Sequence, residues 1–172
     1  MKKKIVIALV VAVVLAGGWY GKERAIQYYS RQAGIAEQKG DYAKAIKHFN
    51  KVVLLQPRTV RARTWRARLY FNNGNVNEAI DDLNAAIKLD KNNPEAHLGL
   101  GLIRLQEGDL KEAVREFTIV IKEEPKWVEA YLSREVAYRK LGEKDKAMAD
   151  VKKVLKIDPK NQAAKNAMKM ME

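Results

Sequence analysis

Apolar residues recur along most of the chain with the spacing of amphipathic helices. In four segments they occupy positions i, i+1, i+4, i+7 and i+8, which lie on one helical face. All twenty positions of this pattern are apolar. They are Ala45, Ile46, Phe49, Val52 and Val53; Ala79, Ile80, Leu83, Ala86 and Ile87; Ala113, Val114, Phe117, Val120 and Ile121; Ala147, Met148, Val151, Val154 and Leu155. Each segment therefore predicts a helix with one buried face.

The four segments belong to a repeat of 34 residues. Glycines recur at this interval as Gly40, Gly74, Gly108 and Gly142. An earlier helix is expected to end just before each glycine, because glycine readily adopts the left-handed conformation that ends a helix. Asn93 followed by Pro94 is typical of a helix start. The predicted unit is helix, turn, helix, and self-similarity at this period indicates a repeat array.

These repeats resemble the tetratricopeptide repeat (TPR) family over residues 26–161. Among the residues that carry the resemblance are Tyr29, Ala33, Gly40, Phe49, Pro57, Tyr70, Gly74, Ala86, Gly101, Gly108, Phe117, Pro125, Tyr131, Tyr138, Gly142 and Pro159. The resemblance implies an all-α fold, an α-α superhelix of four helix-turn-helix repeats. Arg63 and His97 stand where the family has a large apolar residue, and Glu135 stands where it packs a small one.

We therefore divide the chain into an N-terminal segment, residues 1–21, and a TPR domain, residues 22–172. The predicted repeats cover residues 26–59, 60–93, 94–127 and 128–161. Residues 162–172 are expected to form a capping helix, since an open helical stack needs its last apolar face covered.

The N-terminal segment has a different composition. Three lysines, residues 2–4, precede an apolar run, residues 5–20, that contains no ionisable group. A helix of this run would be about 24 Å long, against about 30 Å for the hydrocarbon layer of a bilayer. We interpret it as a retained membrane anchor, because Trp19 and Tyr20 would lie at the membrane interface. The alternative is a signal peptide cleaved near Ala16–Gly18.

Both interpretations predict the same topology. The three lysines should stay in the cytoplasm, which sends the rest of the chain across the membrane. We expect a single-pass protein of the bacterial inner (cytoplasmic) membrane with its C-terminal TPR domain outside the cytoplasm. Cleavage would instead give a secreted or periplasmic protein.

Composition excludes most catalytic chemistry. The chain has no cysteine and two histidines, so disulfides, thiolate chemistry and multi-histidine metal sites are ruled out. The glycines fall at turn positions and form no phosphate-binding loop. We expect no enzymatic activity, no cofactor and no metal site.

The resemblance implies that the first helix of each repeat lines a concave surface that binds a peptide or helix of another protein. Arg61, Trp65 and Arg68 share one helical face, and guanidinium groups beside an indole suit an acidic segment. The candidate partner-binding groove consists of Arg31, Arg61, Trp65, Arg68, Phe71, Asn72, Leu98, Leu102, Leu105, Leu132, Arg139 and Lys140.

We therefore expect a non-catalytic scaffold or adaptor of the bacterial cell envelope. With 33 basic and 21 acidic residues the net charge is +12, which attracts polyanions. The alternative is a cytoplasm-facing adaptor or nucleic-acid-associated protein that uses the arginine-rich helix, residues 58–68. Nucleic acid is disfavoured, because acids dilute the charge and no nucleic-acid motif is present. Self-association through the concave face remains open.

Overall fold

The fold is described from a computed structural model, which covers the backbone of residues 2–171 and the side chains of residues 18 and 20–171. These described residues form nine helices and no strands, as the all-α interpretation predicted. In order they are α1 (Lys2–Gln38), α2 (Tyr42–Leu55), α3 (Val60–Asn72), α4 (Val76–Leu89), α5 (Pro94–Glu107), α6 (Leu110–Glu123), α7 (Val128–Lys140), α8 (Lys144–Ile157) and α9 (Gln162–Met171).

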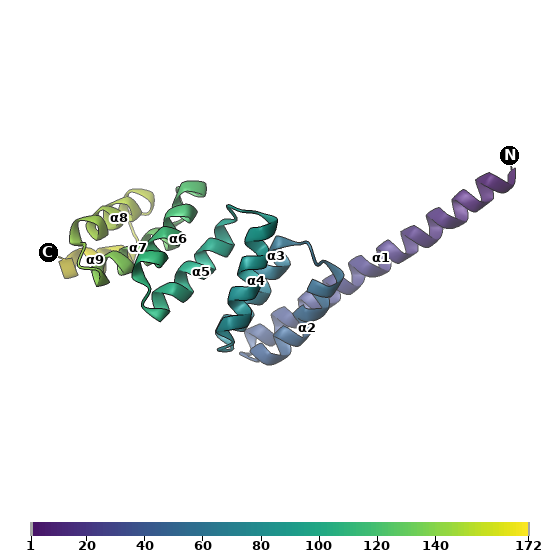
Figure 1. Cartoon of the computed structure of the whole chain (residues 1–172), viewed down its shortest axis with the longest axis horizontal. Helices are drawn as coiled ribbons and strands as arrows, with labels where there is room; N and C mark the ends of the chain where they lie inside the picture. The colour runs from purple at the N-terminus through teal and green to yellow at the C-terminus, as the bar shows by residue number, and fades with distance from the viewer. Residues whose placement is uncertain (1, 172) are drawn as a thin grey trace.

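The helices pair in sequence order into an open superhelix, as Figure 1 shows. The C-terminal part of α1 packs against α2, α3 against α4, α5 against α6, and α7 against α8. The short helix α9 packs on α8, with Ala164 buried and Met168 and Met171 against the last core cluster. This is the capping arrangement that the apolar face of residues 162–172 predicted.

The turns contain the glycine and helix-capping residues that the sequence predicted. The four repeat glycines have positive φ, between 72° at Gly40 and 85° at Gly108, so a side chain at these positions would strain the backbone. Asn93 caps α5, since its side-chain oxygen accepts a hydrogen bond from the Ala96 amide at 3.0 Å. Pro94 occupies the first turn of that helix. Each repeat therefore reverses direction sharply, which keeps its two helices in contact.

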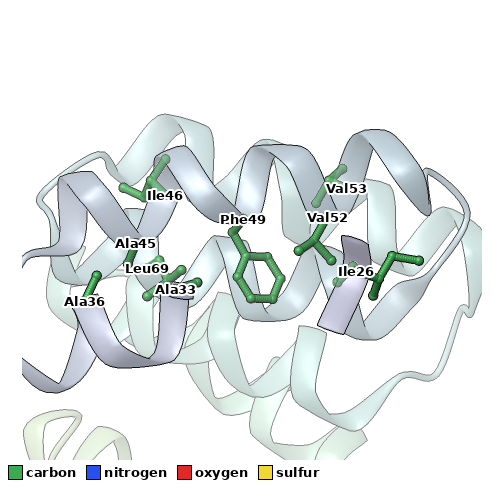
Figure 2. Packing of buried hydrophobic residues seen from close by; sticks show 10 residues of the cluster. Ile26, Ala33, Ala36, Ala45, Ile46, Phe49, Val52, Val53 and Leu69 are labelled. Carbon is green, nitrogen blue, oxygen red and sulfur yellow. The ribbon is translucent and has the colours of Figure 1, made fainter. Parts of the chain in front are cut away.

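The core is a chain of small clusters, one after another along the stack. In the first cluster Phe49 of α2 lies between α1 and α3, as Figure 2 shows. The ring is 2% exposed, and Ile26, Val52 and Val53 fill the end of the helix pair away from the turn. In all four repeats the twenty positions of the apolar pattern are buried or half-buried.

Helix α1 is much longer than the other helices. Its backbone is helical without interruption from Lys2 to Gln38, and it extends beyond the repeats in Figure 1. The first buried side chain of α1 is Ile26 among those that the structure describes. Within that part of the chain, no helix is long and apolar enough to cross a membrane. Most side chains of the predicted anchor, residues 5–20, and of the alternative cleavage site, Ala16–Gly18, lie outside the described residues.

Candidate functional site

A groove of about 540 Å³ opens on the side of the superhelix formed by the first helix of each repeat. Helices α3, α5 and the start of α7 supply nearly all of its wall, and Leu83 of α4 contributes to its floor. The lining residues are Arg61, Thr64, Trp65, Ala67, Arg68, Phe71, Leu83, Glu95, Leu98, Gly99, Leu102, Ile103, Trp127 and Glu129. The groove thus spans repeats two to four.

Trp65 forms the centre of the basic end of the groove. The guanidinium carbons of Arg61 and Arg68 lie 5.9 and 5.6 Å from the centroid of its ring. At these distances each cation is attracted to the ring face. The indole also packs against Phe49, with ring centroids 5.2 Å apart. Its Nε1 donates a hydrogen bond to Glu37 at 3.3 Å, so the ring is held in one orientation.

The five arginines of residues 58–68 lie in different environments. Arg63 and Arg66 turn away to Asp82 of α4, with the closest N–O distances at 3.3 and 2.6 Å. The hydrogen bonds to Asp82 are the main cause that raises the pKa of Arg66 above its ordinary value. These two arginines stabilise the helix pair and are not free to bind a ligand.

Arg58, Arg61 and Arg68 remain accessible. Arg58 is exposed in the turn between α2 and α3. Arg68 forms an ion pair with Glu37 at 3.0 Å, while Arg61 forms none with any residue that the structure describes. The Arg68 side chain is 57% exposed, so water screens this ion pair and the pair contributes little to stability. Arg61 and Arg68 therefore supply the positive charge of the groove.

The opposite end of the groove is apolar with an acidic edge. Leu98 and Leu102 of α5 line it, and Trp127 closes it from the turn before α7. Glu95 and Glu129 lie on the rim, at the positions that correspond to Arg61 in the next two repeats. The charge at this equivalent position therefore changes sign along the groove, from basic in repeat two to acidic in repeats three and four.

The structure brings together about half of the predicted groove residues: Arg61, Trp65, Arg68, Phe71, Leu98 and Leu102. The other six lie outside this lining. Arg31, Asn72 and Lys140 are exposed, and Leu105 and Leu132 pack half-buried against core clusters. The sixth, Arg139, donates to buried Glu135 at 3.0 Å. Trp127 lines the groove although the sequence analysis missed it; the signal was a large aromatic residue between a proline and a helix start.

Buried polar groups outside the groove have structural partners. The Nε2 atom of His97 lies 2.9 Å from the Lys91 carbonyl, which can only accept, so Nε2 carries a hydrogen. The Nδ1 atom lies 2.5 Å from a carboxyl oxygen of Glu116. In repeats two and four, Arg63 and Tyr131 likewise donate to the carbonyls of Pro57 and Pro125. Arg63, His97 and Tyr131 occupy equivalent positions in successive repeats, and each holds the turn that precedes its repeat.

No group of three or more potential His, Cys, Asp or Glu ligands is arranged to hold a metal ion among the described residues. The arrangement of paired helices around a concave groove instead defines a helical-repeat scaffold, a class that binds other proteins.

Family models identify the repeats. A TPR repeat model matches residues 67–108, and a tetratricopeptide repeat model matches residues 26–59 and 129–161. These matches cover more than half of the chain, so the protein belongs to the tetratricopeptide repeat family. TPR proteins are generally non-catalytic interaction scaffolds. None of the curated protein sequences matches the chain significantly.

Several solved TPR structures have the same fold. MamA is 24% identical, with a TM-score of 0.73, over 87% of this chain and 81% of its own. PilF of Pseudomonas aeruginosa is 14% identical, with a TM-score of 0.79, over 88% and 69%. The first TPR domain of Spaghetti (RPAP3), bound to the HSP90 peptide SRMEEVD, is 21% identical, with a TM-score of 0.62, over 65% and 89%. At these identities the likeness shows the fold.

Proposed function

We propose that this protein is a non-catalytic adaptor of the bacterial cell envelope that captures an extended or helical segment of another protein. The observation that carries the proposal is the groove, in which accessible Arg61, Trp65 and Arg68 lie beside an apolar wall. Aromatic and arginine side chains dominate binding energy in protein interfaces. Leu98 and Leu102 supply apolar contact, and the two arginines select a segment with acidic residues.

The location of the adaptor is part of the proposal. Residues 5–20 hold it in the inner membrane, residues 2–4 stay in the cytoplasm, and the repeats lie outside. Cleavage near Ala16–Gly18 would release the same adaptor as a periplasmic or secreted protein. In support of a peptide ligand, a TPR domain of the same fold is known bound to the peptide SRMEEVD, which carries acidic residues.

Photo-crosslinking tests the groove directly. A photoreactive amino acid at Thr64, which lines the groove, should yield a crosslinked protein partner in cells. The matched control places the same group at Asp81, which is exposed on the outer helix α4. Crosslinking at Asp81 with equal yield to the same product would contradict the site.

Charge reversal then tests the two arginines. Arg61→Glu with Arg68→Glu should abolish the Thr64 product, while circular dichroism reports unchanged helix content. The control with the same change of charge is Arg115→Glu with Lys122→Glu on outer helix α6, which should leave the product intact. Undiminished capture by the Arg61/Arg68 double variant would refute the assignment of these arginines.

The alternative function, an adaptor for nucleic acid or another polyanion, predicts a different result. Its binding should fall steeply with salt, because phosphate contacts release counterions. Arg58 precedes α3, and of the arginines at residues 58–68 only Arg58, Arg61 and Arg68 are accessible, since Arg63 and Arg66 are bound to Asp82. A nuclease-sensitive crosslink at Thr64 would favour this alternative over a protein partner.

A further inference from the structure

The end of the first repeat where α1 leaves the superhelix carries an exposed apolar side chain among basic residues. Leu54, near the C-terminus of α2, is 74% exposed. Its neighbours Val52 and Val53 are buried beside Ile26, so this end of α2 lies beside the point where α1 leaves the repeats (Figure 2). In Figure 1, α1 continues outward from this same end of the α1–α2 pair.

This end of the first repeat is predominantly positively charged. Residues 20–26 and 51–59 contain four basic residues, Lys22, Arg24, Lys51 and Arg58, and one acidic residue, Glu23. The four basic side chains are exposed and form no ion pair with any described residue. Their charge is therefore available to an external anionic surface.

The turn that follows Leu54 is rigid. The guanidinium of Arg63 donates two hydrogen bonds to the Pro57 carbonyl, at 3.1 and 2.9 Å. Leu55 packs against the first core cluster, and the Thr59 amide donates to the Gln56 carbonyl at 3.2 Å. Leu54 and Arg58 are therefore presented in a fixed arrangement, which lowers the entropic cost of binding a surface.

The length of α1 sets the height of this end above a membrane. Ile26 lies six residues after Tyr20, the last residue of the apolar run, which corresponds to a rise of about 9 Å. The headgroup layer on one side of a bilayer is about 5–8 Å thick. An apolar run of about 24 Å is also shorter than the hydrocarbon layer, which draws its flanking residues towards the bilayer. The first repeat would then begin at the outer edge of the headgroups.

We propose that the surface formed by Leu54, Lys22, Arg24, Lys51 and Arg58 docks on the anionic headgroups of the bilayer that holds residues 5–20. Leu54 inserts between headgroups, and the basic side chains contact lipid phosphates, a combination that strengthens interfacial binding. Docking fixes the tilt of the whole superhelix, because α1 enters the first repeat without a break. This inference rests on the proposed membrane anchor.

Single-cysteine labelling of the full chain tests the docking, because the native sequence contains no cysteine. Leu54→Cys is labelled with the environment-sensitive fluorophore NBD and reconstituted into nanodiscs of phosphatidylcholine with phosphatidylglycerol. A fraction of the lipid carries a spin label at its headgroup, which quenches nearby NBD. Met170→Cys in α9 is the matched control, since Met170 is also 74% exposed but lies at the far end of the superhelix.

We expect a blue shift and strong quenching at Leu54→Cys, and neither at Met170→Cys. Adding Lys51→Glu and Arg58→Glu should remove most of the quenching while the chain stays in the nanodisc. Unquenched Leu54→Cys in a chain that co-purifies with nanodiscs would overturn the docking and leave the anchor standing. A chain that does not co-purify with nanodiscs would overturn the anchor and the docking together. Equal quenching in pure phosphatidylcholine would overturn the role of the anionic headgroups.

Discussion

The guanidinium of Arg134 in α7 donates to both carboxylate oxygens of Asp150 in α8, at 2.9 and 2.7 Å. Asp150 is buried, and Thr118 of α6 accepts a third hydrogen bond from Arg134 at 2.9 Å. Two repeats earlier, Arg66 binds Asp82 and Asn50 in the same way. These bidentate pairs join three successive helices, so they tie neighbouring repeats together.

Removing one member of this pair should be costly. Asp150→Ala leaves the half-buried guanidinium of Arg134 without its counter-ion, and we expect a loss of about 3 kcal/mol in the free energy of unfolding. Glu112→Ala, which removes an exposed ion pair with Arg115, should cost less than about 1 kcal/mol. Urea denaturation followed by circular dichroism compares the two. Equal losses for both variants would contradict the structural role of Asp150.

Two helical glycines should respond in opposite ways to alanine. A Cβ at Gly101 would lie 2.5 Å from the Phe117 ring, so Gly101→Ala should destabilise the fold by about 1–3 kcal/mol. A Cβ at Gly34 meets nothing within 4 Å, so Gly34→Ala should stabilise by about 0.5–1 kcal/mol through helix propensity. Thermal or urea unfolding of the two variants measures both signs. A stabilising Gly101→Ala would mean that α5 and α6 pack less closely than described.

Stability should fall at high pH through Tyr131. Burial raises the pKa of the Tyr131 hydroxyl above its usual value of about 10, and nearby Arg134 only partly offsets this. The unfolded chain therefore loses the Tyr131 proton first as the pH rises, and stability is lost above about pH 10. Tyr131→Phe should flatten this part of the profile and cost about 1 kcal/mol at neutral pH, since the hydroxyl donates to Pro125.

The control for that profile is Tyr28→Phe, because Tyr28 is 58% exposed. Its stability should fall with pH as in the unmodified protein, measured by urea denaturation across the alkaline range. If Tyr28→Phe flattened the profile as much as Tyr131→Phe, burial of Tyr131 would not be its cause.

Topology can be tested with one engineered thiol. Asn161 lies in the turn before α9, but its side chain caps that helix by accepting a hydrogen bond from the Ala164 amide at 3.0 Å, so it should not be replaced. Exposed Lys160 is the better position. In intact cells Lys160→Cys should react with a membrane-impermeant maleimide if the repeats lie outside the cytoplasm. Reaction only after lysis would reverse the proposed orientation and favour cytosolic partners.

Apolar spacing was sufficient to predict the paired helices. Positions such as Phe49, Phe117 and Val151 are buried because their spacing leaves them no other face, and the repeat interval fixes which helices pair. The positions of the turns could be predicted because the ability of glycine to adopt positive φ depends only on its own backbone. These parts of the fold depend on patterns within one repeat, so the sequence alone specified them.

Polar pairing between helices was not predicted, because it depends on side chains from different repeats. The sequence analysis noted that His97 replaces a large apolar residue of the family, but it did not predict that His97 is buried against Glu116. The available signal was a column of acids at the repeat interval, Asp82, Glu116 and Asp150, on otherwise apolar faces. Such acids on a buried face indicate partners on the neighbouring helix.

The groove could be predicted in position but not in detail. Helical spacing placed Arg61, Trp65 and Arg68 on one face, and the structure brings them together. Helical spacing could not show that Arg63 and Arg66 point to Asp82, because arginines lie on both faces of α3. Which arginine faces the groove depends on the rotation of α3 against α4, and only packing determines that rotation.

The change of charge between Arg61 and the equivalent Glu95 and Glu129 has a consequence for recognition. A bound segment that carries acidic residues at one end and basic residues at the other is attracted along its whole length in one orientation. Reversed, the same segment meets like charges at both ends, which is unfavourable. In the proposed binding mode, the groove would therefore select the orientation of its ligand as well as its composition, and the reversed sequence would bind less well.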